Sequence, residues 1–416
     1  MAVGTALLDD LAALVGGRAR AGGEADHVGG VPAALVAAPS STDEAAAVMR
    51  ACADHDLAVA FRGQSTALHW GAPPRRLDVL VDTAGLGQVV EHVAGDLVAV
   101  VQAGLRVDEL NARVGEHGQQ LALDQPRPGA SIGGTLATAR SGARRVHYGA
   151  PRDLVLGVTI VRADGVVAHA GGKVVKNVAG YDLAKLVTGA YGTLGLVTEA
   201  VFRLHPLAQA SRWLAVRCSD GGDAARRAQQ LVGSQLTPTA VEVQRSPGGP
   251  DVQLLVLLEG TAHGVDERTA PTLALLGEGA GEVERDAAEV AALPGAPDDV
   301  LVKVAVPLTG VRRLLEAVAA AEVSRGVPLQ VRGSAGVGVL HVSAPSGTDA
   351  ETVATLLRDL RGACAGGSAV LLQAAPAVHG QVDGWGPVDG IDLMRRVKDQ
   401  FDPQGRLAPG RFVGGI

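Results

Sequence analysis

Four polar, glycine-rich loops in the first half of the chain constrain most strongly what it can fold into. They are "FRGQST" (61–66), "RPGASIGGTLATARSG" (127–142), "VHYGAPRD" (146–153) and the block 171–198, which contains "GGKVVKNVAGYDL" and "GAYGTLGLVT". Small residues let a backbone approach a ligand closely enough for its N–H groups to bind phosphate oxygens. Several such loops on different strands favour a ligand longer than one phosphate group, and a dinucleotide has that length.

Two common nucleotide-binding motifs do not match these loops. No G-x-x-x-x-G-K-[ST] occurs, because Val174 in "GGKVV" stands where a P-loop needs a serine or threonine for magnesium. The stretch "GAYGTLG" (189–195) is G-x-x-G-x-x-G, but its flanks do not fit a Rossmann fingerprint. The alternative is that the glycines form ordinary turns in a chain that has 56 of them; four such loops together favour ligand binding.

The composition is that of a folded protein with room for two or three domains. Of 416 residues, 47% are hydrophobic and 19% are charged, so disorder is not expected. The net charge of −7 argues against a nucleic-acid partner, which requires clustered cations. Cys52, Cys218 and Cys364 form no C-x-x-C pair, which disfavours a disulfide framework, a zinc site and a self-contained iron–sulfur cluster.

The amino-terminal stretch "MAVGTALLDDLAALVGG" does not have the pattern of a signal peptide. It carries Asp9 and Asp10 and no basic residue before its apolar positions. No uncharged apolar run approaches the roughly 20 residues that a membrane span requires. We therefore expect a cytoplasmic protein with no direct membrane insertion, which reaches the inner face of a membrane only through partners.

Short strands and helices alternate in the first half without the regular repeat of a doubly wound sheet. "STDEAAAVMRACADHD" is typical of a helix, with Ser41 and Glu44 in capping-box spacing. "DLVLGVTIVRADGVVAHAGG" is typical of two strands joined at Asp164–Gly165. After "FRLHPLAQ" alternating strands and amphipathic helices indicate a second domain. The pattern predicts an α+β fold.

Four segments resemble the FAD-binding domain of the vanillyl-alcohol-oxidase/PCMH flavoprotein superfamily: "RGQST", "PGASIGGTLAT", "YGAPRDLVLGVTIVRADG" and "KNVAGYDLAKLVTGAYGTLGLVTEA". Within it the likeness is to the FAD-binding E subunits of glycolate oxidases, over about residues 30–207 and again at "MRRVKDQFDPQGRLAPGRF". The resemblance implies an N-terminal helix or extension (1–26), a two-lobed PCMH-type FAD-binding domain (27–207), an α/β cap domain (208–375) and a C-terminal segment that packs back on the FAD domain (376–416).

The resemblance also implies which residues contact FAD. Residues 62–66 match the family's pyrophosphate loop, normally R-G-G-G-[TS], with Gln64 and Ser65 in place of glycines. The stretch 129–138 matches the second part of the cradle, 141–149 borders the isoalloxazine ring, and 196–197 meets the adenine. The implied contacts are Arg62, Gly63, Gln64, Ser65, Thr66, Gly129, Ser131, Ile132, Gly133, Gly134, Thr138, Ser141, Gly142, Tyr148, Gly149, Leu196 and Val197. The first loop has no histidine and the second no cysteine, which implies noncovalent FAD.

The stretch "SAGVGVLH" (334–341) matches a motif that holds a divalent ion in related flavin-dependent 2-hydroxyacid dehydrogenases, H-A-G-D-G-N-L-H. Ser334, Val337 and Val339 replace the first histidine, the aspartate and the asparagine, and only His341 remains. One histidine cannot define a metal site, so we expect no metal, and His341 is expected to end a buried strand. In the tail, Ala408 replaces the asparagine that precedes Pro-Gly in those enzymes.

Three functions remain open from the sequence. The loss of the metal motif favours the FAD-binding subunit of a glycolate-oxidase-like 2-hydroxyacid dehydrogenase complex, beside a catalytic flavoprotein subunit and an iron–sulfur subunit. The alternative is a self-sufficient FAD-dependent oxidase or dehydrogenase for glycolate, D-lactate or another 2-hydroxyacid. Its candidate residues are Arg332 as a carboxylate clamp, His341 as a base and Lys185 near the flavin. The third is a flavin-free scaffold.

Overall fold

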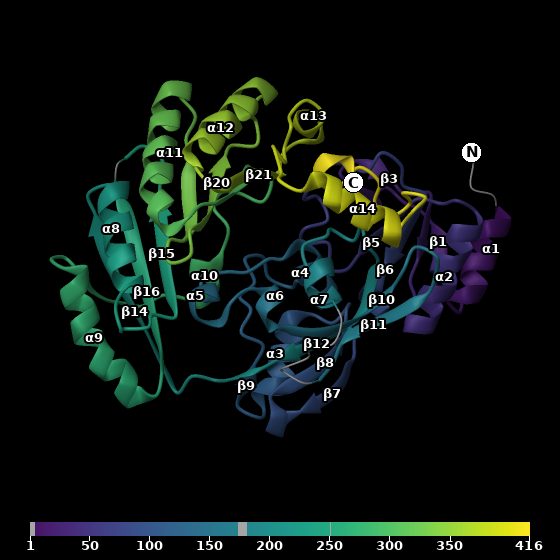
Figure 1. Ribbon diagram of the computed structural model, residues 1–416, viewed down its shortest axis with the longest axis horizontal. Coiled ribbons are helices and arrows are strands. Elements are labelled where there is room, and N and C mark those ends of the chain that lie inside the picture. Colours follow the sequence, from purple (N-terminus) through teal and green to yellow (C-terminus); the bar gives the residue numbers. More distant parts are fainter. Residues whose placement is uncertain (1–4, 174–180, 250) are drawn as a thin grey trace.

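The computed structural model describes residues 5–173, 181–249 and 251–416. Figure 1 shows two groups of elements: a two-sheet part that carries the N-terminus, and a single large sheet with its helices to the left. The C-terminal segment, in yellow, returns to the two-sheet part.

The first sheet has four strands in the order β1-β4-β6-β5. The inner pairs β4–β6 and β6–β5 are parallel, whereas β1 is antiparallel to β4, so the N-terminal segment contributes an edge strand and not only a helix. The elements are α1 (Thr5–Leu14), β1 (Ala19–Ala21), β4 (Leu35–Ala37), α2 (Thr42–Asp54), β5 (Val59–Arg62) and β6 (Val79–Asp82). The expected N-cap is confirmed, because Ser41 Oγ accepts from the Glu44 amide at 3.1 Å.

The second sheet is antiparallel, in the order β11-β10-β12-β8-β7. The expected hairpin at Asp164–Gly165 is confirmed as the β10–β11 connection, where Gly165 has φ +78°. The strands are β7 (Val89–Val93), β8 (Val98–Gln102), β10 (Val155–Val161), β11 (Val167–Gly171) and β12 (Leu196–Arg203). Shorter elements of this part are β2 (His27–Val28), β3 (Val31–Pro32), α3 (Val107–Gly115), β9 (Gln119–Gln120), α4 (Ile132–Thr138), α5 (Arg145–Tyr148), α6 (Pro151–Leu154), α7 (Leu183–Val187) and β13 (His205–Pro206).

The third sheet, which we call the cap sheet, has eight antiparallel strands in the order β17-β14-β16-β15-β19-β20-β18-β21. Its strands are β14 (Ala210–Cys218), β15 (Ala240–Arg245), β16 (Val252–Gly260), β17 (Gly281–Val283), β18 (Val300–Ala305), β19 (Gln330–Ser334), β20 (Val339–Ala344) and β21 (Ser368–Gln373). Its helices are α8 (Gly221–Val232), α9 (Ala262–Leu276), α10 (Ala287–Ala291), α11 (Val311–Arg325), α12 (Ala350–Ala363) and α13 (Pro376–His379).

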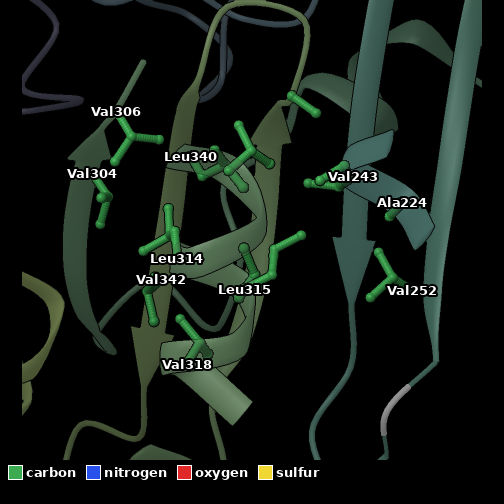
Figure 2. Packing of buried hydrophobic residues seen from close by; sticks show 14 of the residues in the cluster. Ala224, Val243, Val252, Val304, Val306, Leu314, Leu315, Val318, Leu340 and Val342 are labelled. Atoms are coloured by element: carbon green, nitrogen blue, oxygen red, sulfur yellow. The ribbon is translucent and has the colours of Figure 1, made fainter. Parts of the chain in front are cut away.

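One face of the cap sheet is apolar and the other carries polar side chains. Figure 2 shows Val304, Val342 and Leu340 of the sheet packed against Leu314 of α11. Successive strand residues point to opposite faces, so Lys303 and His341, which lie next to these valines and leucines, face away from the helices. This opposite face, which we call the polar face for Lys303 and His341, also carries Trp213, Leu255 and Leu257, which pack against Val290 of α10.

The C-terminal segment docks through a buried ion pair. Lys398 of α14 (Ile391–Phe401) lies 2.6 Å from Asp402 and donates to the carbonyls of Thr193 and Leu407 at 2.8 and 3.0 Å. Leu407 also forms a parallel bridge to Val59 of β5. These contacts confirm the α+β fold with a tail that returns to the first part of the chain. In the described part of the chain, no helix has the length and apolar character needed to cross a bilayer.

We expect Asp402→Ala to lower the free energy of unfolding by about 3–5 kcal/mol, because it leaves the Lys398 ammonium buried without its carboxylate. Asp392→Ala removes an exposed partner of Arg395 on the same helix, and we expect it to change stability by less than ~1 kcal/mol. Urea denaturation of both variants measures the difference. Equal effects would show that the tail does not depend on the buried pair.

Candidate functional site

A cleft lies where the loop after β5 meets α4 and the segment that leads into β12. It encloses about 820 Å³ free of protein atoms, part of which is open to solvent. Residues from the ranges 61–68, 131–140 and 187–197 line it, together with Thr83, Ala103 and Arg411. Of the expected FAD contacts, those that line it are Arg62, Gly63, Gln64, Ser65, Thr66, Ser131, Gly133, Gly134, Thr138, Leu196 and Val197.

The backbone of this cleft fits a diphosphate group. The amides of residues 64–67 donate to no acceptor among the described residues, and Ser65 has a left-handed φ of +59°. Such a run of free N–H groups in a turn forms an anion-binding nest. A Cβ on Gly63 would lie 2.1 Å from Ser131 Oγ, so only glycine allows the two loops to approach this closely. The residues present therefore fit the FAD that the resemblance implies.

Arg62 lines the cleft, but two carboxylates already neutralise its positive charge. Its guanidinium lies 2.7 Å from Asp26, which precedes β2, and 2.7 Å from Asp82, the last residue of β6. Hydrogen bonds from Arg20, from the Gly23 amide and from Arg62 hold the pKa of Asp26 well below its usual range. Arg62 thus anchors the loop that follows it and brings no net positive charge to the cleft.

Two other arginines line the cleft, and the sequence analysis did not single them out. Arg140 follows α4, and Arg411 lies in the C-terminal segment; each is only 5% exposed. Neither forms an ion pair with a carboxylate in the described residues. Arg140 lies within the glycine-rich loop 127–142. An arginine in a loop that is expected to bind a ligand was the signal that the sequence offered.

A second, smaller pocket lies between the polar face of the cap sheet and the loop that follows α4. It is lined by Ser141 and Gly142 of the loop, Arg145 of α5, and Glu242, Arg332, Ser334 and His341 of the cap sheet. The expected isoalloxazine neighbours Ser141 and Gly142 thus meet two of the expected substrate residues here. The resemblance implied that Ser141 and Gly142 border the flavin ring, and in the structure they share this pocket with Arg332 and His341.

Several polar atoms around this pocket are buried without a hydrogen-bond partner. They are Ser141 Oγ, Glu242 Oε1, Arg332 Nε and Ser334 Oγ. Buried polar atoms in folded proteins almost always have a partner, so a group of orphaned ones around one pocket points to a polar ligand. Arg145 and Arg332 line the pocket as well, and neither forms an ion pair within the described ranges.

Burial shifts the protonation of the ionisable groups on this face. Burial raises the pKa of Glu242 to about 8 and lowers the pKa of Lys303 to about 8. Burial, together with the charges of Lys303 and Arg145, lowers the pKa of His341 to about 3. His341 is therefore neutral near pH 7, and Glu242 is the carboxyl whose charge changes closest to that pH.

The stretch 334–341 forms a hairpin. Ser334 ends β19, the turn contains Gly336 and Gly338, and His341 is the third residue of β20. A Cβ on Gly336 would lie 2.8 Å from Val146 Cγ2, which shows how tightly the turn packs on the two-sheet part. The expectation that His341 ends a buried strand is wrong, because its ring faces the pocket near the start of the strand. Among the described residues, no three His, Cys, Asp or Glu side chains are grouped to hold a metal.

Other expected residues lie outside both cavities. Lys185 of α7 is exposed, pairs with Asp182 at 3.0 Å and lines neither cavity. Tyr148 packs edge-on against His205 at 4.9 Å, and it lines neither cavity. Gly129, Ile132 and Gly149 also line neither. Residues 174–180, part of the fourth loop, lie outside the described residues.

Two family models match the chain. The model described as "FAD binding domain" matches residues 33–171, and the model "FAD linked oxidases, C-terminal domain" matches residues 385–412. The glycolate oxidase subunit GlcD of Bacillus subtilis is 26% identical over 91% of this chain and 88% of its own length. A D-lactate dehydrogenase of Anaerostipes hadrus is 26% identical over 92% of this chain and 89% of its own. A D-lactate dehydrogenase of Archaeoglobus fulgidus is 31% identical over 55% of this chain and 52% of its own.

Solved flavoenzyme structures share the fold. The 4-ethylphenol oxidase from Gulosibacter chungangensis superposes with a TM-score of 0.73, at 16% identity, over 98% of this chain and 96% of its own. Alkyldihydroxyacetonephosphate synthase superposes with a TM-score of 0.70, at 18% identity, over 92% of this chain and 78% of its own. At these identities the likeness shows the arrangement of the chain and not its substrate.

We expect Gly63→Ala to lower the affinity for FAD at least about tenfold, because the added Cβ must displace Ser131 and with it the second loop of the cradle. Flavin absorption per protein after desalting measures the loss. Gly115→Ala, where a Cβ meets nothing within 4 Å, is the matched control and should keep its full flavin content. Full flavin content in Gly63→Ala would contradict the cradle described above.

Proposed function

We propose that this chain, which two family models of FAD-binding and FAD-linked oxidase domains match, oxidises a 2-hydroxyacid with its own FAD at the boundary of the cap sheet. The observation that carries the proposal is the second pocket, in which Arg145 and Arg332 have no carboxylate partner in the described ranges. The names of the relatives, glycolate oxidase subunit and D-lactate dehydrogenase, support a small hydroxyacid such as glycolate or D-lactate as the substrate.

The two arginines are suited to hold the substrate carboxylate. A guanidinium is planar and can donate two parallel hydrogen bonds to a carboxylate. Arg332 uses one nitrogen on the Glu289 carbonyl, at 3.2 Å, and its buried Nε is left without an acceptor. Arg145, the first residue of α5, also lines the pocket. A carboxylate between them would satisfy both groups.

Oxidation of the hydroxyl carbon also needs a group that takes the hydroxyl proton. FAD, when bound, supplies the acceptor for the hydride that leaves the α-carbon. Glu242 has a free carboxylate oxygen in the pocket, and its pKa of about 8 lies close to working pH, which suits a general base. His341, with its pKa near 3, is a weaker base and serves as a neutral hydrogen-bonding group.

Anaerobic titration of the purified chain with glycolate and D-lactate tests the proposal, and we expect either acid to bleach the visible flavin band. Arg332→Met should raise the concentration of acid needed by about 10- to 100-fold, because a charge-assisted hydrogen bond is lost. Arg325→Met, which removes an exposed arginine paired with Asp359 on the far side of the cap, should behave like the parent chain. If no 2-hydroxyacid bleaches the flavin band of the isolated chain, the proposal is refuted.

The rate of bleaching should rise with pH up to about pH 8 and then level off, because Glu242 accepts a proton only in its ionised form. Below that pH the rate should fall by about tenfold per unit as the carboxyl becomes protonated. Glu242→Gln should abolish both the rate and this dependence. Lys303→Met is the control, since Lys303 titrates in the same range. A profile that survives in Glu242→Gln and disappears in Lys303→Met would assign the base to Lys303.

We also infer that the FAD is held noncovalently, since the loop 62–66 contains no histidine or cysteine that could attach it. Acid precipitation should release all of the flavin into the supernatant. Flavin that stays with the precipitated protein would show a covalent bond.

A second candidate function is favoured by one observation, the replacement of metal-binding residues in the hairpin by Ser334, Val337 and Val339. In that case the chain is the FAD-binding subunit of a glycolate-oxidase-like complex, beside a catalytic flavoprotein subunit and an iron–sulfur subunit. Its flavin would then stay oxidised when the isolated chain meets hydroxyacids and become reduced once the catalytic subunit is added. The same anaerobic titration therefore separates the two functions.

A further inference from the structure

Arg140 and Arg411 place two positive charges in the wall of the FAD cleft with little to balance them. Arg140 donates one hydrogen bond, to Thr66 Oγ1 at 2.7 Å, and stacks 5.3 Å over the Trp70 ring. Its Nε and Nη1 are buried and have no acceptor. Arg411 donates to the Leu68 and Trp70 carbonyls, and its Nε also has no acceptor.

Such an arrangement is costly unless an anion is present. A buried cation without a counter-ion loses its hydration and gains no ion pair in return. The charge of Arg127, which lies outside the lining of the cleft, is close enough to disfavour the charged form of Arg140 further. Burial is the main reason that the pKa values of both Arg140 and Arg411 fall to about 10. The missing counter-ion must come from outside the described residues.

We propose that Arg140, supported by Arg411, is the counter-ion for a negatively charged group of the bound FAD. Arg140 contacts Thr66, the last residue of the loop whose amides are free, so an anion bound by that loop lies beside the guanidinium. Arg140 also directly precedes Ser141, which lines the pocket at the cap sheet. It therefore stands between the nest and the proposed substrate pocket.

Two groups of FAD supply the required negative charge. One is the diphosphate, which is always charged, and the other is the reduced isoalloxazine ring, which gains a negative charge near N1. ADP carries the first group and lacks the second, so binding of ADP and the flavin reduction potential distinguish the two sources.

The test uses the full chain stripped of flavin and refilled. If the diphosphate is the anion, Arg140→Met should weaken binding of oxidised FAD by about 10- to 100-fold, measured by quenching of flavin fluorescence. The flavin-free variant should unfold at the same or a higher temperature than the flavin-free parent, because an unpaired buried charge is gone. An equal loss of ADP affinity assigns the charge to the diphosphate. Unchanged ADP affinity with a more negative reduction potential assigns it to the flavin ring.

Arg406→Met is the matched control. Arg406 is also a buried arginine that forms no ion pair in the described ranges, and it donates to the Ala163 carbonyl outside the cleft. It should leave FAD affinity and reduction potential unchanged, and Arg140→Lys should recover part of what Arg140→Met loses. The proposal is overturned if Arg140→Met has the same FAD affinity and the same flavin reduction potential as the parent chain. It is also overturned if Arg406→Met loses as much FAD affinity as Arg140→Met does. Neither readout depends on turnover of a substrate.

Discussion

The close approach of two loops at Gly63 and Ser131 is the constraint on which the rest of the site depends. A Cβ at position 63 would lie 2.1 Å from the Ser131 hydroxyl, so the loop after β5 can meet the start of α4 only through glycine. The ion pairs of Arg62 with Asp26 and Asp82 hold that loop from the other side. With both in place, the amides of residues 64–67 remain free, and Thr66 meets Arg140. The free amides of the loop and the Arg140 guanidinium therefore lie on the same wall of the FAD cleft.

The cap sheet completes the site by using its two faces differently. Val241 and Val243 enter the core under the helices, while Glu242 between them turns toward the two-sheet part. This alternation places a carboxyl, an arginine and a histidine on one surface without disturbing the core on the other. The protein thus joins a cofactor cleft from one half of the chain to a charged, partly unsatisfied surface from the other.

Local patterns in the sequence predicted local structure well. The Ser41 cap, the Asp164–Gly165 turn and the returning tail all appear where they were expected, because each depends on neighbouring residues or on a recognisable motif. Predictions that required knowing a side chain's direction fared less well. His341 was expected at the end of a strand and is the third residue of β20, which continues to Ala344. The direction of a side chain is set by strand register and by what packs on the other side, and one stretch of sequence contains neither.

By itself the sequence determined the glycine loops and the α+β class, since turn residues and hydrophobic periodicity are local properties of the chain. The FAD cradle was implied by the resemblance of these loops to a flavoprotein family. Ser334, Val337 and Val339 also differ from the metal-binding motif that the stretch 334–341 resembles. Only the tertiary structure decided that this stretch is a hairpin facing Arg145 and Glu242, and that Arg140 and Arg411 share a wall. Charges far apart in the chain acquire a chemical role only when folding buries them together, because desolvation and missing partners depend on all the elements that surround them.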